Sequence, residues 1–361
     1  MKKYLTTSAA LAIAASAASA GGIDRSGQNI GVIFQDTGEM GGYAQFSFGN
    51  VSPEANGSFT GGVASPLGSY QQTGFAFKQQ LSDALSLSVI YDQPLGALVE
   101  YDAGVPFFGG FADIESDAVT VLGRYELANG FSVHGGVRAL SVEGSILTFF
   151  GATPALLSAE SSFDLGTVVG AAYEREDIAL RVALTYSSAI TSEFTATENG
   201  VDTAFDVEFP ESINLDFQTG VAQDTLVFGT VRWVGWGGFN LTTPGDGVPG
   251  VSPAEYVNFE DDTITYTVGV GRRLSEELSV AVSYTYEEQG VIPSTTALAP
   301  TTGLSSIAVS GSYALDGGVT ISGGITYGIP GDQIVENGLV GDVNFDDNEV
   351  IGVGVRVGFA F

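Results

Sequence analysis

The chain has 361 residues with 42 acidic and only 12 basic side chains, and its formal net charge is -30 although 44% of its residues are hydrophobic. So many hydrophobic residues exclude a disordered acidic chain, and so few Lys and Arg exclude a nucleic-acid-binding protein, which needs clustered cations. The absence of cysteine excludes disulfide frameworks and Cys-based zinc sites, and we expect neither a metal nor a cofactor.

Residues 1–20 predict a secretory signal peptide. They combine Lys2 and Lys3 with an apolar stretch at 9–17 and small residues at 18–20. The apolar stretch is too short to cross a bilayer, and no later run of about eighteen apolar residues follows. We therefore expect an exported chain that begins near Gly21 and has no transmembrane helix.

Residues 43–361 alternate with period two, which is typical of β-strands. In residues 351–361 every odd position is apolar, and the even positions are Gly, Arg or Ala. Fourteen such strands are expected, near 43–52, 69–80, 85–100, 114–127, 131–147, 160–174, 178–194, 203–221, 225–238, 263–273, 278–288, 305–315, 319–328 and 349–361.

The second face of these strands decides between two all-β classes. A secreted soluble sandwich would carry Lys, Glu and Gln there, whereas this chain carries mostly Ser, Thr, Gly and Ala. Small polar residues suit a barrel lumen, with the apolar face turned to lipid. A closed barrel also satisfies every backbone hydrogen bond within a bilayer. The sequence predicts a transmembrane antiparallel β-barrel in the outer membrane of a Gram-negative bacterium.

Short and long links alternate along the chain. Short links such as 82–84 and 128–130 predict tight periplasmic turns, and long links such as 52–68, 240–262 and 329–348 predict extracellular loops. The even number of strands leaves both ends of the barrel chain on the periplasmic side.

Several motifs, in order, resemble the FadL-type long-chain fatty-acid transporters of the outer membrane. They are residues 91–96 (Tyr-Asp-Gln-Pro-Leu-Gly), residues 209–215 (Phe-Pro-Glu-Ser-Ile-Asn-Leu), the Trp-rich residues 231–239, and the last hairpin with its aromatic end. The resemblance implies a monomer that binds a fatty acid or another hydrophobic molecule, such as an aromatic hydrocarbon, in its lumen.

The resemblance also implies a plug inside the barrel. The family's plug has an Asn-Pro-Ala element, which this chain lacks before its first strand. Only residues 21–42 precede the barrel. They predict a short N-terminal hatch, whose gating contacts cannot be carried over from the family.

Pro94 and Gly96 interrupt the third strand. Proline cannot donate to a sheet ladder and glycine weakens one. The resemblance implies that ligand leaves sideways through a gap at this kink. The alternative is a bulge that only shapes the barrel.

The few cations within the strands fall on the inward face if Val and Phe face lipid. Guanidinium groups bind carboxylates through paired hydrogen bonds, so Arg138 and Arg181 are the leading candidates for a ligand anchor. Alternatively, the inward cations simply pair with acidic residues such as Asp92, Asp164 or Asp216. The inward candidates for ligand binding are Lys78, Arg124, Arg138, Arg181, Arg356 and the lone histidine, His134.

Catalysis is not expected. Ser132 is two residues from His134 on the same face, about 7 Å away between Cα atoms. The pattern supplies neither an orienting acid nor an oxyanion donor, so the protein is not expected to be an enzyme.

The long links carry two further features. Acidic residues crowd 246–262 and 332–349, which suits a solvated surface or divalent ions that bridge to lipopolysaccharide. Exposed apolar clusters mark contact sites, so aromatic residues in two other links predict an entrance groove or self-packed loops. These residues are Phe107, Phe108, Phe111, Phe149 and Phe150.

Two other functions stay open. A general diffusion porin would be a passive, water-filled pore with large ion conductance. A surface-binding barrel, such as an adhesin, would use its loops and transport nothing.

Overall fold

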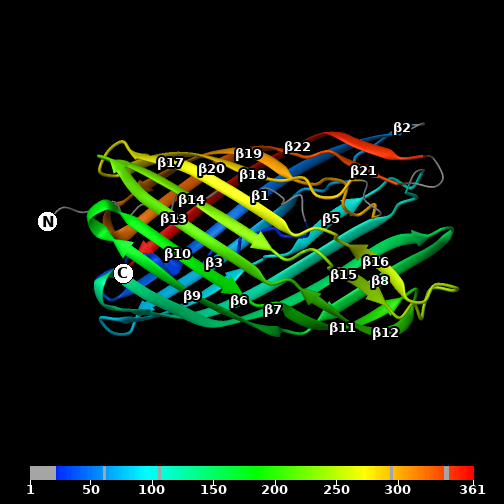
Figure 1. Cartoon of the computed structure of the whole chain (residues 1–361), viewed down its shortest axis with the longest axis horizontal. Coiled ribbons are helices and arrows are strands. Elements are labelled where there is room, and N and C mark those ends of the chain that lie inside the picture. The colour runs from blue at the N-terminus through cyan, green and yellow to red at the C-terminus, as the bar shows by residue number, and fades with distance from the viewer. Residues whose placement is uncertain (1–21, 60–61, 105–106, 293–295, 337–340) are drawn as a thin grey trace.

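The structure is a computed structural model that describes residues 22–59, 62–104, 107–292, 296–336 and 341–361. The expected signal peptide, residues 1–20, lies outside the described residues. The described chain is a closed antiparallel barrel of 14 strands (Figure 1), as the alternation predicted.

Some of the fourteen strands of the barrel wall are divided into two segments. In chain order they are β1 (Gly42–Phe59), β3 (Tyr70–Gln80), β4 (Leu85–Asp92) with β5 (Gly96–Glu100), β6 (Phe111–Glu126), β7 (Phe131–Phe150), β8 (Thr153–Ser161) with β9 (Asp164–Arg175), β10 (Leu180–Ser187) with β11 (Ile190–Glu198), β12 (Val201–Phe209) with β13 (Ser212–Ala222), β14 (Thr225–Val234), β17 (Thr263–Arg273), β18 (Leu278–Glu287), β19 (Leu304–Ala314), β20 (Val319–Pro330) and β22 (Val343–Ala360).

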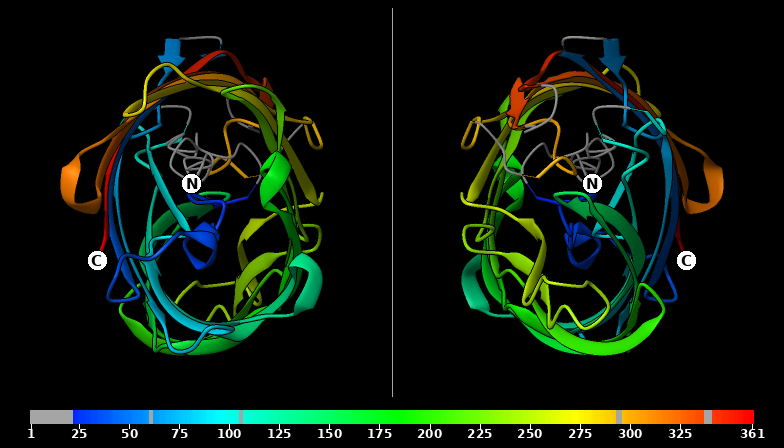
Figure 2. Two further views of the ribbon diagram at one scale, coloured as in Figure 1. Left: turned by 90° about the vertical axis from the view of Figure 1, so that its left-hand side faces the viewer. Right: turned by 90° about the vertical axis from the view of Figure 1, so that its right-hand side faces the viewer.

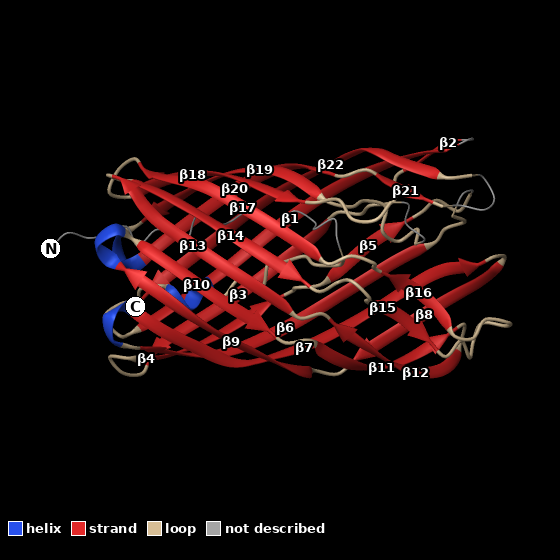
Figure 3. Ribbon diagram, in the orientation of Figure 1, coloured by secondary structure: helices blue, strands red, loops and turns tan. Residues whose placement is uncertain are grey.

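Short elements complete the fold. They are the strands β2 (Gly62–Ala64), β15 (Asn240–Thr243), β16 (Ala254–Asn258) and β21 (Gln333–Val335), and the 3-10 helices η1 (Gly31–Phe34), η2 (Ala128–Gly130), η3 (Glu176–Ile178) and η4 (Asp316–Gly318). The tight turns with η2, η3 and η4 gather at one end of the barrel (Figure 3). In the η2 turn, Asn129 and Gly130 have φ values of 64° and 81°, a backbone that Asn and Gly adopt at low cost.

The first and last strands close the barrel. β1 pairs with β22 from Tyr43 opposite Ala360 to Ser58 opposite Asn344. At the turn end, the Gly42 amide donates to the Phe361 carbonyl at 2.9 Å. Both ends of the barrel chain therefore lie beside the tight turns.

Side-chain alternation separates the two faces of the wall. In β22, Val353 and Val355 are 50% and 48% exposed on the outside, while Gly352 and Gly354 turn inward. An apolar belt around a whole barrel would be unfavourable in water, but it is favourable against lipid. The chain is a membrane-spanning β-barrel of the outer-membrane type. Among the described residues, no helix is long and apolar enough to cross a membrane, a finding that does not bear on strands.

Two links that were expected to be loops are largely strand. β1 continues to Phe59 and β22 begins at Val343, so the links 52–68 and 329–348 were assigned too much loop. Here Asn56 pairs with Asp347. Beyond the apolar belt the outward residues, such as Asn344, are polar and exposed, while inward residues such as Phe345 are buried in the apolar cluster. The ladder therefore continues without the lipid-facing alternation that reveals a strand.

The N-terminal segment, residues 22–41, lies inside the barrel (Figure 2). Its apolar residues Ile30, Val32 and Ile33 pack against inward residues of the wall such as Leu122 and Val168. A larger apolar cluster fills the half of the lumen nearer the long loops, and Trp236 is completely buried there. We call the two regions the turn-side and loop-side halves of the lumen.

Candidate functional site

Two inward cations donate hydrogen bonds to backbone carbonyls of the N-terminal segment. Lys78 Nζ donates to the Gln35 carbonyl at 2.7 Å. Arg124 contacts the Ile33 carbonyl at 3.4 Å and forms an ion pair with Glu174. Both side chains are buried, and their partners belong to the protein.

Arg138, a leading anchor candidate, lies further along the same face. Its guanidinium donates to the Gln28 side-chain oxygen and to Thr120 Oγ1, the latter at 2.9 Å. It therefore contacts the N-terminal segment and does not line the apolar cavity described below.

The other anchor candidate also meets the segment. The Arg181 guanidinium carbon lies 4.7 Å from the centroid of the Phe34 ring. Arg356 borders a second cavity between the segment and the wall. The structure thus brings the predicted cations together around residues 28–36.

His134 is also part of this packing. Its Nε2 lies 3.0 Å from Thr185 Oγ1, and its ring meets Phe34 edge-on. Ser132 Oγ accepts a hydrogen bond from Arg124 Nε at 3.2 Å. Serine and histidine therefore have separate partners, and no catalytic pair forms here.

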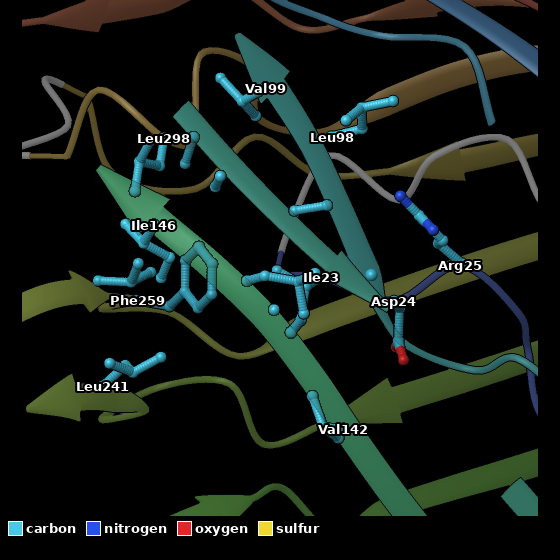
Figure 4. A pocket seen from close by; sticks show the side chains of 18 of the residues that line it. Ile23, Asp24, Arg25, Leu98, Val99, Val142, Ile146, Leu241, Phe259 and Leu298 are labelled. Atoms are coloured by element: carbon cyan, nitrogen blue, oxygen red, sulfur yellow. The ribbon is translucent and has the colours of Figure 1, made fainter. Parts of the chain in front are cut away.

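An apolar cavity occupies the loop-side half of the lumen (Figure 4). It encloses about 1220 Å³, including space open to solvent. Its walls come from β5, β6, β7, β12 and the loop around β15 and β16, and its floor is formed by residues 22–25. The apolar residues on its walls include Leu98, Ile114, Val142, Ile146, Leu157, Phe194, Phe205, Val207, Phe209, Phe239, Leu241, Val257, Phe259 and Leu298.

Two of the polar residues at the floor, which were absent from the sequence-based candidates, lie close together. Arg25 and Tyr70 both line the cavity, and the Arg25 guanidinium carbon lies 4.2 Å from the Tyr70 ring centroid. The available signal was the scarcity of cations in a chain with only 12. Strand parity missed Arg25 because that residue precedes the first strand.

The N-terminal segment forms hydrogen bonds to the kink in the third strand of the wall, between β4 and β5. The Pro94 carbonyl accepts hydrogen bonds from the amides of Arg25 and Ser26, at 2.7 and 3.2 Å. The Gly96 amide donates to the Ile23 carbonyl at 2.8 Å. Pro94 and Gly96 therefore flank a real interruption between β4 and β5, and its missing partners are supplied from inside the lumen.

The wall is unpaired beside this kink. β3 pairs with β4 only from Phe75 to Gln80, and residues 70–74 pair with neither β4 nor β5 in the described chain. The Gln93 side-chain oxygen accepts from the Thr73 amide at 3.0 Å in place of a strand. A second cavity of about 990 Å³ adjoins this place.

The aromatic residues proposed for an entrance groove lie in or beside the outer loops. Phe107 is buried and its ring centroid is 4.2 Å from that of Tyr101. Phe108 is exposed and pairs with Phe149 at 5.9 Å, while Phe150 meets Tyr256 at 5.7 Å. Phe111 begins β6. None of these lines the apolar cavity.

A buried carboxylate fixes the loop that covers the cavity. Glu198 is fully buried and accepts hydrogen bonds from the Tyr256 hydroxyl at 2.9 Å and the Gly247 amide at 2.9 Å. Burial, together with the hydrogen bond to Glu198, raises the pKa of Tyr256, so its hydroxyl stays protonated and donates. Among the described residues, no group of three or more His, Cys, Asp or Glu could hold a metal ion.

No protein-family model and no curated protein matches this sequence, but solved structures do. One is the crystal structure of a Pseudomonas aeruginosa FadL homologue, with a TM-score of 0.75, 12% identity, and coverage of 96% of this chain and 98% of that one. The Pseudomonas putida toluene transporter TodX gives a TM-score of 0.66 at 12% identity over 89% and 90% of the two chains. The Ralstonia pickettii toluene transporter TbuX gives a TM-score of 0.64 at 12% identity over 96% and 97% of the two chains. The chain therefore has the fold of the FadL-type outer-membrane barrels.

Proposed function

We propose that this barrel takes up hydrophobic molecules across the outer membrane, with long-chain fatty acids as its preferred substrate. The ligand enters between the outer loops, binds in the apolar cavity and leaves sideways through the wall beside Pro94 and Gly96. The protein acts as a monomer among outer-membrane lipid and lipopolysaccharide, without a catalytic step.

One observation carries the proposal: the segment that forms the floor of the apolar cavity also binds to the interruption between β4 and β5. Residues 23–25 line the cavity, and backbone groups of residues 23, 25 and 26 form hydrogen bonds to the kink. A ligand that moves this segment would disturb the hydrogen bonds to Pro94 and Gly96. The unpaired wall at residues 70–74 would then offer a path to lipid.

The alternatives fit the lumen less well. A diffusion porin needs a water-filled lumen, whereas the N-terminal segment and the loop-side apolar cluster occupy this one. An adhesin has no use for an apolar cavity of this size.

The lateral path can be tested by closing it reversibly. Because the chain has no cysteine, the double variant Thr73→Cys, Gln93→Cys introduces the only thiol pair, across the unpaired wall. We expect oxidation to abolish uptake of labelled oleate into cells and reduction to restore it.

A matched pair controls for the disulfide itself. Ser283 and Ala308 face each other in the closed ladder of β18 and β19, so Ser283→Cys with Ala308→Cys should leave uptake unchanged. Full uptake through the oxidised Thr73→Cys, Gln93→Cys barrel would contradict the lateral path.

A further inference from the structure

Two hydrogen-bond donors at the floor of the apolar cavity lack protein partners. Arg25 is 7% exposed and Tyr70 is 9% exposed. The Tyr70 hydroxyl has no hydrogen-bond partner among the described residues. Within the same residues, the Arg25 guanidinium makes no ion pair, and its only recorded side-chain contact is the Tyr70 ring.

Among the described residues, no acidic residue near Arg25 forms an ion pair with it. Asp24, the adjacent residue, forms an ion pair with Arg232 at 3.1 Å. Asp92 accepts from Ser26 Oγ at 3.0 Å. Asp113 and Glu115 are the carboxylates whose charges act on Arg25, but both are exposed residues of β6 that alternate with its inward residues.

This isolation distinguishes Arg25 from three other buried cations. Arg181, which is only partly buried, also shows just a ring contact within the described residues, but it does not line the apolar cavity. Lys78, Arg124 and Arg138 each donate to a named protein group. A guanidinium stays charged in proteins, and an unpaired buried charge is costly. The arrangement therefore suits an anion that arrives from outside the chain.

The guanidinium packs directly against a glycine of the wall. Any side chain at Gly96 would overlap the Arg25 guanidinium, and Gly96, Arg25 and Tyr70 all line the cavity. Apart from Asp24, Glu143 and Thr301, the other described lining residues are apolar or glycine. Such a site suits a molecule with one anionic head and a long apolar tail.

We propose that Arg25 and Tyr70 bind the carboxylate of an amphiphilic ligand while its tail lies along the apolar walls. The guanidinium donates two parallel hydrogen bonds to the carboxylate, a geometry that its planar fork favours, and the tyrosine hydroxyl donates a third. This inference rests on the proposed function and specifies which ligands the cavity prefers. It assigns the cation of the anchor to the N-terminal segment and not to the wall.

The test compares two ligands with the same tail and different heads. Labelled oleate and oleyl alcohol are bound to the purified full chain in detergent micelles. Arg25→Gln is expected to weaken oleate binding by about 10- to 100-fold, the range for hydrogen bonds to a charged group, and to change oleyl alcohol binding by less than about threefold. Tyr70→Phe removes one oxygen and should weaken oleate by about two- to tenfold.

Arg272→Gln is the matched control, because that guanidinium is exposed and bonds to Thr225 at 2.7 Å outside the cavity. It should change neither affinity. Equal loss of both ligands with Arg25→Gln, or no loss of oleate, would overturn the anchor. A selective loss of oleate with Arg138→Gln but not with Arg25→Gln would also overturn it.

The same measurements separate this inference from the proposed function. A wild-type barrel that binds oleyl alcohol and toluene but not oleate would refute the carboxylate anchor and leave hydrophobic uptake standing. A barrel that binds none of the three would contradict the proposed function and the anchor with it.

Discussion

The two halves of the lumen differ in the kind of groups that fill them. In the turn-side half, residues 28–36 are held by buried cations that donate to carbonyl and side-chain oxygens of the segment. In the loop-side half, aromatic and aliphatic side chains surround a cavity whose only cation is Arg25 among its described lining residues. Cations of the wall thus donate hydrogen bonds to the protein in the turn-side half. At the floor of the loop-side half, the Arg25 guanidinium has only its contact with the Tyr70 ring among the described residues.

This contrast separates structural charge from charge available to a ligand. A barrel strand must turn its cations inward, since a lipid-facing Arg costs about 2–4 kcal/mol at the membrane midplane. An inward position is therefore poor evidence for ligand binding. The informative property is whether the cation has a partner.

The largest effect is expected from removing the contents of the turn-side half. Deletion of residues 22–41 should raise single-channel conductance in a planar bilayer by about tenfold, because it empties the turn-side half of the lumen and removes the floor of the apolar cavity, so that water can enter past the loop-side cluster. The full chain is the control and should conduct little. A full chain that conducts as well as the deletion variant would contradict the plug and favour a porin.

A second prediction concerns the ion pair at the boundary between the halves. Asp24 and Arg232 are both buried, so Asp24→Asn should lower the free energy of unfolding by about 3–5 kcal/mol, because it leaves a buried charge unpaired. Guanidinium unfolding in detergent micelles measures this change.

Asp224→Asn is the control for this prediction. Its ion pair with Arg273 lies at a turn and is partly exposed, so the change should stay below about 1 kcal/mol. Equal effects of the two substitutions would mean that Asp24 does not fix the segment to the wall.

The smallest effect is expected from narrowing the loop-side cavity. Ala112 is buried and lines the cavity, so Ala112→Phe should weaken oleate binding by about tenfold, as expected when about two methylene groups lose their contacts at about 0.8 kcal/mol each. Ala308→Phe adds the same volume on an inward position of β19 outside the cavity and should leave affinity unchanged. If the control weakens binding as much, the ligand lies elsewhere in the lumen.

The barrel itself could be predicted from the sequence because the alternation of residues in each strand shows which side chains face outward and which face inward. The alternation in residues 351–361 reflects two solvents, lipid and lumen, on opposite faces. The lipid-facing alternation ends where the wall leaves the membrane. For this reason the alternation did not predict strand in the outer parts of β1 and β22.

The breaks in the wall were predictable only in part. Pro94 marks the interruption between β4 and β5, because it cannot donate to a ladder. The break between β10 and β11, at residues 188–189, contains no proline. It became visible only when the pairing of Ser187 with Ser212 and of Ile190 with Phe209 was known.

The inward cations show the same limit. Parity placed Arg138 and Arg181 on the lumen face, but it could not say what they would meet there. Both meet the N-terminal segment. The sequence did not predict the position of Arg25, because residues 22–41 carry no periodicity from which a direction can be read.

The sequence by itself determined the wall of this protein: the strands, their two faces and the end at which the turns lie. Those properties follow from neighbouring residues, since a strand's alternation is local. The tertiary structure alone decided which polar groups in the lumen are paired. Asp24 meets Arg232 from 208 positions away, and Arg25 meets the Tyr70 ring without forming an ion pair in the described chain. Such meetings depend on how the barrel closes around its N-terminal segment, and no local pattern records them.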